Sequence, residues 1–305
     1  MNVVQRFDDY WFLPVPRERL AALRILTGSF AVIYLLVRSV HLTSYAHFAA
    51  PDFAPVGVVR WLDAPLSALA VYASFGLTLI AGVAFVAGIR FRVLGPLFAL
   101  GFLWVTSYRN SWGMIYHQDN LVALHLLLLA LAPANHAWAV DAPRAQLSDE
   151  AVDGRYGWAI RAMCWVTVIS YVLAGIAKLE GAGLAWSHGD VLRTHVAYDA
   201  VRKLELGGVH SPIGAWLVPY QWPFAVLGPL TLVLELGAPL ALLGRRAAAV
   251  WVVGIWSFHI GVILLMAITF AYPVSGVAFA AFFRVERLAY FGRAQRMLAR
   301  FGLKP

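Results

Sequence analysis

The sequence predicts an all-α membrane protein, a polytopic transmembrane helical bundle of about eight spans. Hydrophobic residues make up 61% of the 305 residues, charged residues only 13%, and the mean hydropathy is +0.71. Soluble domains carry about a quarter charged residues, so this composition indicates a bilayer. Apolar stretches long enough to cross a ~30 Å hydrocarbon core follow one another, with short polar loops between them. We therefore expect residues 1–305 to form a single embedded domain.

The predicted elements begin with a short interfacial N-terminus, because the aromatic run Tyr10–Phe12 directly follows two aspartates. The apolar runs then predict helices over about 20–38, 66–88, 93–108, 119–134, 158–178, 222–243, 247–267 and 269–284. Basic residues at Arg90–Arg92 and Arg245–Arg246 indicate tight turns between adjacent spans. Neighbouring helices are expected to satisfy the carbonyl groups freed by prolines in or near the spans, which are Pro133, Pro229, Pro239 and Pro273.

The distribution of Lys and Arg predicts the orientation. An arrangement with both termini inside places fifteen of them in cytoplasmic segments and seven in outer ones, the basic tail 285–305 included among the former. The segment 179–221 is then the longest outer loop, and its aromatic residues suggest that it lies along the interface. We expect an integral protein of a bacterial cytoplasmic membrane, with Lys178 open to the exoplasmic side. The net charge of +8 suits the headgroups of the lipid bilayer better than nucleic acid.

Ionisable side chains inside the spans are costly and suggest function. Lys178 ends the apolar run 171–179. It either extends along its stem to the headgroups or faces the bundle interior, where desolvation would favour a neutral amine able to act as a base. For Glu235 the simplest interpretation is a structural ion pair with Arg24, with Arg161 as a competing partner. His259 and His125, each on an apolar helix, are more typical of hydrogen-bonded core residues than of ligands.

The stretch 109–120 places a cation, amides, an indole, a phenol and an imidazole at a predicted membrane boundary. An aromatic belt with Asp119 or Asn120 as helix N-cap explains Trp112 and Tyr116 but does not require His117. Asn110, Trp112, Tyr116 and, beyond Lys178, Trp186 are candidate substrate-binding residues. No zinc-type or nucleotide-binding motif is present in the sequence, so we expect neither a metal nor a nucleotide.

Three segments together resemble the HTTM family, the membrane domain shared with vitamin K-dependent gamma-carboxylase. They are Arg24-x-Leu-x-Gly28, the polar stretch that ends in Tyr116-His117, and Ala174-Gly-Ile-Ala-Lys-Leu179 followed by Trp186. Phe258-His259 and Glu235 also fall where that family's pattern is expected. The resemblance is collinear over roughly 15–285.

The resemblance implies an all-helical membrane protein with lyase or quinol-oxidising chemistry. Lys178 would be the base that deprotonates a reduced quinone similar to vitamin K hydroquinone, His117 would support the reacting oxygen, and His259 would face the same site. Two departures from the carboxylase pattern weaken the expectation that this protein carboxylates other proteins. The large lumenal region of the carboxylase is missing after the last span, and Tyr116 stands where asparagine is expected.

Two classes of function therefore stay open. One is an enzyme with a lysine-based site that acts on a quinol or another amphipathic substrate, or that modifies a secreted peptide. The other is a non-enzymatic HTTM scaffold that binds lipid or assists maturation, export or immunity for a peptide. A transporter is less favoured, because neither paired interrupted helices nor an internal repeat is evident.

Overall fold

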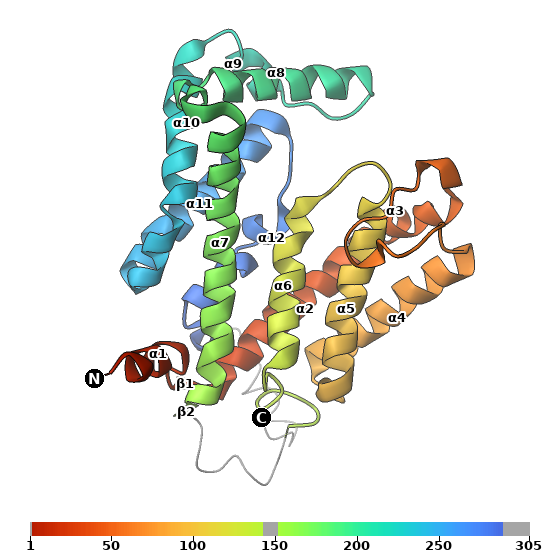
Figure 1. Ribbon diagram of the computed structural model, residues 1–305, viewed down its shortest axis with the longest axis vertical. Helices are drawn as coiled ribbons and strands as arrows, with labels where there is room; N and C mark the ends of the chain where they lie inside the picture. Colours follow the sequence, from red (N-terminus) through yellow and green to blue (C-terminus); the bar gives the residue numbers. More distant parts are fainter. Residues whose placement is uncertain (1, 143–151, 289–305) are drawn as a thin grey trace. The chain divides into compact units, whose positions relative to one another are not determined.

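The computed structural model describes residues 2–142 and 152–288, and almost every regular element in them is a helix (Figure 1). The all-α prediction is confirmed. The strands in the described part are β1 (Val15–Pro16) and β2 (Val152–Asp153), which pair antiparallel. The chain divides into two compact units: unit 1 comprises residues 1–163 and 283–305, and unit 2 comprises residues 164–282. The single domain expected over 1–305 stays a prediction.

Unit 1 is built around three long apolar helices, α2, α4 and α5. Its helices are α1 (Val3–Trp11), α2 (Arg17–Val37), α3 (Ser39–Ser44), α4 (Ala68–Ala87), α5 (Phe91–Asn110), α6 (Asn120–Leu131) and the first turns of α7 (Gly157–Ala182). Short 3-10 turns at Tyr45–His47, Ala50–Asp52, Gly57–Val59, His117–Asp119, Gly154–Tyr156 and Val285–Arg287 complete it. Leu20, Phe85, Phe98 and Phe102 are fully buried and form the centre of the unit.

Two glycines let the long helices of unit 1 approach closely. A Cβ atom on Gly28 of α2 would lie 2.8 Å from the ring of Phe85, and one on Gly82 of α4 would lie 2.6 Å from the ring of Phe98. Small residues at such crossings allow close van der Waals packing, which drives helix association where lipid removes the hydrophobic effect. The aromatic rings therefore fill the space that these glycines leave open.

Unit 2 contains the remainder of α7 and the helices that follow it. These are α8 (Asp190–Glu205), α9 (Pro212–Leu217), α10 (Gln221–Leu236), α11 (Arg245–Met266) and α12 (Ala271–Val274), with 3-10 segments at Gly183–His188, Ala238–Leu243 and Val277–Phe282. Segment 179–221, expected as a loop, is therefore mostly helical. Within this unit α8 runs across the direction of α7 (Figure 1). It exposes Tyr198, Val201 and Leu204, as expected for a helix at a membrane interface.

The predicted count of eight spans is not confirmed. Within the described residues, five helical segments are long and apolar enough to cross a membrane: Arg17–Val37, Ala68–Ala87, Phe91–Asn110, Gly154–His188 and Arg245–Met266. The expected spans 119–134, 222–243 and 269–284 yield shorter helices. The orientation of the chain stays a prediction, and residues 289–305 of the basic tail lie outside the described part.

Proline and glycine explain why these three segments fall short. The α-helix α6 ends at Leu131, two residues before Pro133, and α10 ends at Leu236, after which Gly237 and Pro239 turn the chain into a 3-10 segment. In 269–284, Gly276 has a positive φ of 76° and separates α12 from the 3-10 segment that follows. Apolar composition predicted continuous helices here, but proline cannot donate the backbone hydrogen bond and glycine favours a break.

A buried guanidinium connects α2 to the segment after α6. Arg24 is fully buried, and its Nη1 donates to the carbonyl oxygen of Ala134 at 2.9 Å while Nη2 donates to that of Trp138. A Cβ atom on Gly88 would lie 2.8 Å from Nη1, so the α4–α5 turn closes over the same group. One cation thereby satisfies two carbonyl groups of irregular backbone inside unit 1.

Replacement Arg24→Met is expected to lower the free energy of unfolding by about 2–4 kcal/mol, because two carbonyl oxygens lose a charged donor. Denaturant unfolding in mixed micelles measures this change. The exposed Arg60, changed to Met, serves as control and should leave stability unaltered. Equal stability of the two variants would contradict the anchoring role of Arg24.

Candidate functional site

One face of α7 carries the best-defined group of ionisable residues in unit 2. Tyr171, Gly175 and Lys178 are spaced at intervals of four and three residues, so they lie on the same face of the helix. Lys178 Nζ lies 2.7 Å from Glu235 Oε1 of α10. The side chain of Lys178 is 20% exposed and that of Glu235 only 3%, so the pair is held within the protein rather than among headgroups.

Gly175 allows the carboxylate to reach the lysine. A Cβ atom at this position would lie 3.2 Å from the Cβ of Glu235 and 2.8 Å from the side chain of Leu236. The end of α10 therefore packs directly on the backbone of α7, between the turns that carry Tyr171 and Lys178. A larger residue at 175 would push the two helices apart.

Trp186 is a second neighbour of the lysine amine. Lys178 Nζ lies 5.3 Å from the centre of the indole ring, within the range of a cation–π interaction. The indole Nε1 donates to Thr231 Oγ1 at 2.9 Å, and Thr231 stands one helical turn before Glu235 on α10. The amine thus lies near a carboxylate that belongs to α10 and near an aromatic ring that is hydrogen-bonded to α10.

The carboxylate of Glu235 retains unused hydrogen-bonding capacity. Its Oε2 atom is buried and has no hydrogen-bond partner in the described part of the chain. An unsatisfied buried oxygen is costly, roughly 1–3 kcal/mol, and such atoms are rare in native proteins, where a catalytic role is one of the explanations for them. Here the free oxygen belongs to the same carboxylate that binds Lys178.

His259 of α11 forms a second buried pair in unit 2. Its Nε2 lies 2.7 Å from the hydroxyl of Tyr171, and its Nδ1 is buried without a partner among the described residues. Rings of Phe258 and Phe270 pack against the imidazole, and that of Trp251 against Tyr171. Three predicted site residues, Lys178, Trp186 and His259, therefore lie in one unit with Tyr171 and Thr231.

The structure corrects the predicted partner of Glu235. We expected an Arg24–Glu235 ion pair, but Glu235 binds Lys178 and Arg24 binds the carbonyls of Ala134 and Trp138. Arg161, the other expected competitor, lies with its guanidinium 4.6 Å from the ring centre of Tyr10. The fully buried His125 bonds through Nε2 to the carbonyl of Met163, as expected for a core histidine.

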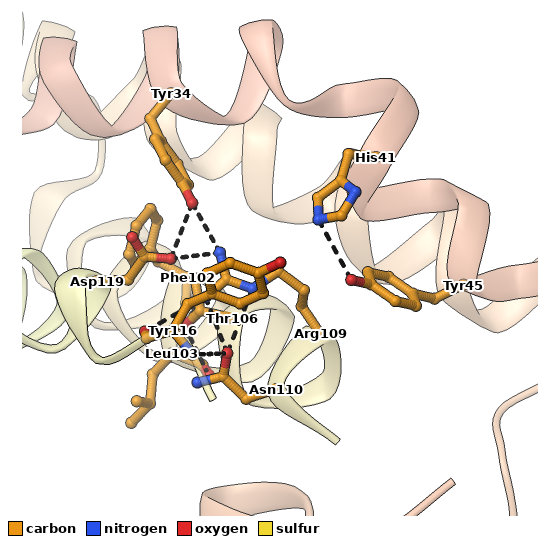
Figure 2. Close-up of polar contacts among 10 residues, drawn as sticks. All are labelled: Tyr34, His41, Tyr45, Phe102, Leu103, Thr106, Arg109, Asn110, Tyr116 and Asp119. Carbon is orange, nitrogen blue, oxygen red and sulfur yellow. Dashed lines mark hydrogen bonds and ion pairs between the residues drawn. The ribbon is translucent and has the colours of Figure 1, made fainter. Parts of the chain in front are cut away.

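A second polar cluster lies in unit 1, where α2, α5 and the start of α6 meet (Figure 2). Arg109 and Asp119 form an ion pair at 2.7 Å and are almost fully buried. The Tyr34 hydroxyl donates to Asp119 Oδ2 at 2.9 Å and accepts from Arg109 Nη1 at 2.8 Å. Asp119 occupies the predicted cap position of α6, but its side chain makes no capping bond because it binds Arg109 instead.

The predicted substrate-binding residues of unit 1 surround this cluster. Asn110 Oδ1 accepts from Arg109 Nη2 at 2.9 Å and from the backbone nitrogen of Tyr116 at 3.0 Å. The ring of Tyr116 lies over the guanidinium of Arg109, and the distance from the ring centre to the guanidinium carbon Cζ is 4.3 Å. Trp112 packs in an aromatic group with Tyr45, Phe48, Phe53 and Tyr108, and its buried Nε1 has no partner in the described part.

His117 is exposed and opens the 3-10 turn His117–Asp119, the far end of which Asp119 anchors. It belongs to unit 1, whereas Lys178 and His259 belong to unit 2, so their expected convergence stays a prediction. Sequence reasoning missed Tyr171, Thr231 and Tyr34. Tyr171 and Thr231 could have been found from their spacing. Tyr171 lies seven residues before Lys178 and Thr231 four residues before Glu235, so each shares a helix face with the charged residue.

Apolar spanning helices with buried ionisable pairs define an integral membrane protein. The family model of the HTTM domain matches residues 12–286, and the chain belongs to the HTTM family. Neither the curated proteins nor the solved structures gave a match. Across residues 2–142 and 152–288, no group of three or more His, Cys, Asp or Glu side chains is placed to hold a metal ion.

Replacement Asp119→Ala is expected to lower the free energy of unfolding by about 3–5 kcal/mol, because it leaves the Arg109 guanidinium buried without a carboxylate. Tyr34→Phe removes only hydrogen bonds of a neutral hydroxyl and should lower it by about 1–2 kcal/mol. Denaturant titration of both variants gives the comparison. Equal effects would show that the ion pair does not organise the cluster.

A pH dependence is expected from His41, which lies 3.2 Å from the hydroxyl of Tyr45. Burial, and then the charges of Arg38 and Arg109, hold the pKa of His41 below its ordinary value of 6.5. The unfolded chain therefore binds more protons, and stability contributed by neutral His41 falls as pH drops from about 7.5 through 6.5. Melting temperatures should fall less with pH in His41→Gln than in the unchanged protein, and identical slopes would contradict this role.

Proposed function

We propose that this HTTM protein is a membrane enzyme in which Lys178 and Glu235 move a proton to or from an amphipathic substrate, a quinol being the favoured class. The observation that carries the proposal is the Lys178–Glu235 pair at 2.7 Å, in which the second carboxylate oxygen has no partner among the described residues. A site poised for proton transfer needs one group that binds the transferred proton and another that stabilises the charge left behind. These two side chains supply both groups.

The chemistry follows from the positions of the three side chains. A quinol hydroxyl can donate a hydrogen bond to Glu235 Oε2 and pass its proton to the pair, while the lysine stabilises the resulting oxyanion. Trp186 offers an aromatic surface beside the amine on which a quinol ring can pack. Tyr171 and His259, the second pair in the unit, can relay a proton, because each combines a donor and an acceptor.

The remaining predicted roles are part of the proposal. His117 would support the reacting oxygen, Asn110, Trp112 and Tyr116 would bind the substrate, and the site would open to the exoplasmic side of a bacterial cytoplasmic membrane. A secreted peptide is the second candidate substrate, since the HTTM resemblance includes a peptide-modifying enzyme. A quinol that acts as reductant would pass two electrons and two protons to dioxygen, leaving quinone and hydrogen peroxide, without any resident metal or nucleotide.

A non-enzymatic scaffold is the alternative function. The same contacts support it because they make unit 2 rigid. The Lys178–Glu235 pair and the Trp186–Thr231 hydrogen bond together lock the end of α7 to α10. A scaffold for peptide maturation, export or immunity would need this rigidity and no proton transfer. The two functions therefore differ in whether the charges themselves are required.

Replacing the charged side chains of Lys178 and Glu235 tests the proposed enzymatic activity. Protein in lipid nanodiscs is supplied with a reduced short-chain naphthoquinol or benzoquinol under air, and quinone absorbance is followed. Lys178→Met and Glu235→Gln are each expected to lower turnover by about 10²- to 10⁴-fold, the usual contribution of acid–base groups. Lys203→Met is the matched control, since Lys203 forms a similarly half-buried pair with Asp199 at 2.8 Å. Unchanged turnover in Lys178→Met would reject the Lys178–Glu235 pair as the proton-transfer site, and no turnover of either quinol would reject the substrate class.

A double substitution separates the enzyme from the scaffold. Removing one partner, as in Glu235→Ala, should lower the free energy of unfolding by about 3–5 kcal/mol, whereas Lys178→Met with Glu235→Leu replaces the pair by apolar contacts and should restore it. The enzyme predicts restored stability with lost turnover. The scaffold predicts that co-purification of a bound peptide, measured by native mass spectrometry, survives in the double variant.

A further inference from the structure

The N-terminal helix α1 presents an apolar face that residues 12–142 and 152–288 leave exposed. None of its residues is buried, and Val3, Val4 and Phe7 are 83%, 65% and 57% exposed. At 100° per residue these side chains share one side of the helix with Tyr10 and Trp11, and the aspartates 8 and 9 fall outside that arc. An exposed apolar stripe of this kind suits an interface between water and hydrocarbon.

Next to this face, within the same unit, lies a groove of about 380 Å³. Four aromatic side chains line it: Phe7, Trp11, Phe12 and Trp158. Its volume lies within the roughly 300–1,000 Å³ that is typical of small-ligand sites. These open, almost wholly apolar walls offer a ligand few hydrogen bonds, so they favour hydrocarbon over a polar ligand.

Backbone contacts place the groove at the ends of two spans. β1 pairs with β2, and α2 begins directly after β1 at Arg17 while α7 begins shortly after β2 at Gly157. A Cβ atom on Gly157 would lie 2.2 Å from the carbonyl oxygen of Leu13, so the two span ends lie side by side. The groove therefore opens at the boundary between headgroups and hydrocarbon, where Trp and Tyr are enriched in membrane proteins.

Cationic groups at the same level complete the lipid-binding character. The guanidinium of Arg161 packs over Tyr10 of α1, 4.6 Å from the ring centre, and Arg6 of α1 is exposed. Guanidinium groups bind phosphate oxygens, and phosphates lie just outside the hydrocarbon at this boundary. We infer that α1 lies in the membrane interface and that the aromatic groove binds one acyl chain of a phospholipid.

Spin labelling tests the position of α1 in the full-length protein in nanodiscs. In a Cys164→Ala background, which removes the single cysteine, nitroxides are attached at Val4→Cys on the apolar face and at Asp9→Cys on the polar face. The label at 4 should collide more with oxygen, and the label at 9 more with a water-soluble nickel chelate. Equal chelate accessibility at both positions would place α1 in water and overturn the inference.

Photo-crosslinking tests the groove with phosphatidylcholine that carries a diazirine on one acyl chain. Labelled peptides identified by mass spectrometry should be enriched in the groove residues, and Trp158→Ala should lower that labelling by about tenfold, as expected when an aromatic wall is removed. Trp61→Ala, at a 70% exposed tryptophan elsewhere in unit 1, should leave it unchanged. If Trp158→Ala does not fold, Phe7→Gln on the exposed helix replaces it. Labelling that neither groove variant lowers would overturn the acyl-chain site.

Discussion

Hydrocarbon cannot solvate a charge, and this constraint governs every ionisable side chain inside the helices. Three cations of the described helices have partners within the protein: Lys178 with Glu235, Arg109 with Asp119, and Arg24 with two carbonyl groups. Because each partner lies on another segment, each contact also determines which segments pack together. Within each unit, these contacts therefore hold segments together and are also the places where chemistry can occur.

Composition alone predicted the helical membrane fold, because a long apolar run has few alternatives to a helix in lipid. The helix lengths were less predictable. In segments 119–134, 222–243 and 269–284 the hydropathy stays high while Pro133, Gly237 and Gly276 change the backbone. Hydropathy measures whether a residue tolerates lipid, and it carries no information about whether the backbone continues as an α-helix.

The site was predictable by residue type but not by partner. Lys178, Trp186 and His259 stand out in an apolar sequence, and the structure places all three in unit 2. Tyr171 and Thr231 were missed because phenol and hydroxyl groups are common in membrane helices and cost little there. The choice of Lys178 over Arg24 for Glu235 depends on the crossing of α7 and α10 at Gly175, and no sequence pattern reports such a crossing.

Gly175 thus makes the charged pair dependent on a position that has no side chain. A methyl group there would meet Glu235 and Leu236 at or below van der Waals distance, so the two helices would separate before either charged residue changed. The substitution Gly175→Ala would therefore break the ion pair without changing either charged residue, because the lysine and the glutamate would no longer reach each other. When HTTM sequences are compared, the residue three positions before the lysine is therefore as informative about a working pair as the lysine itself.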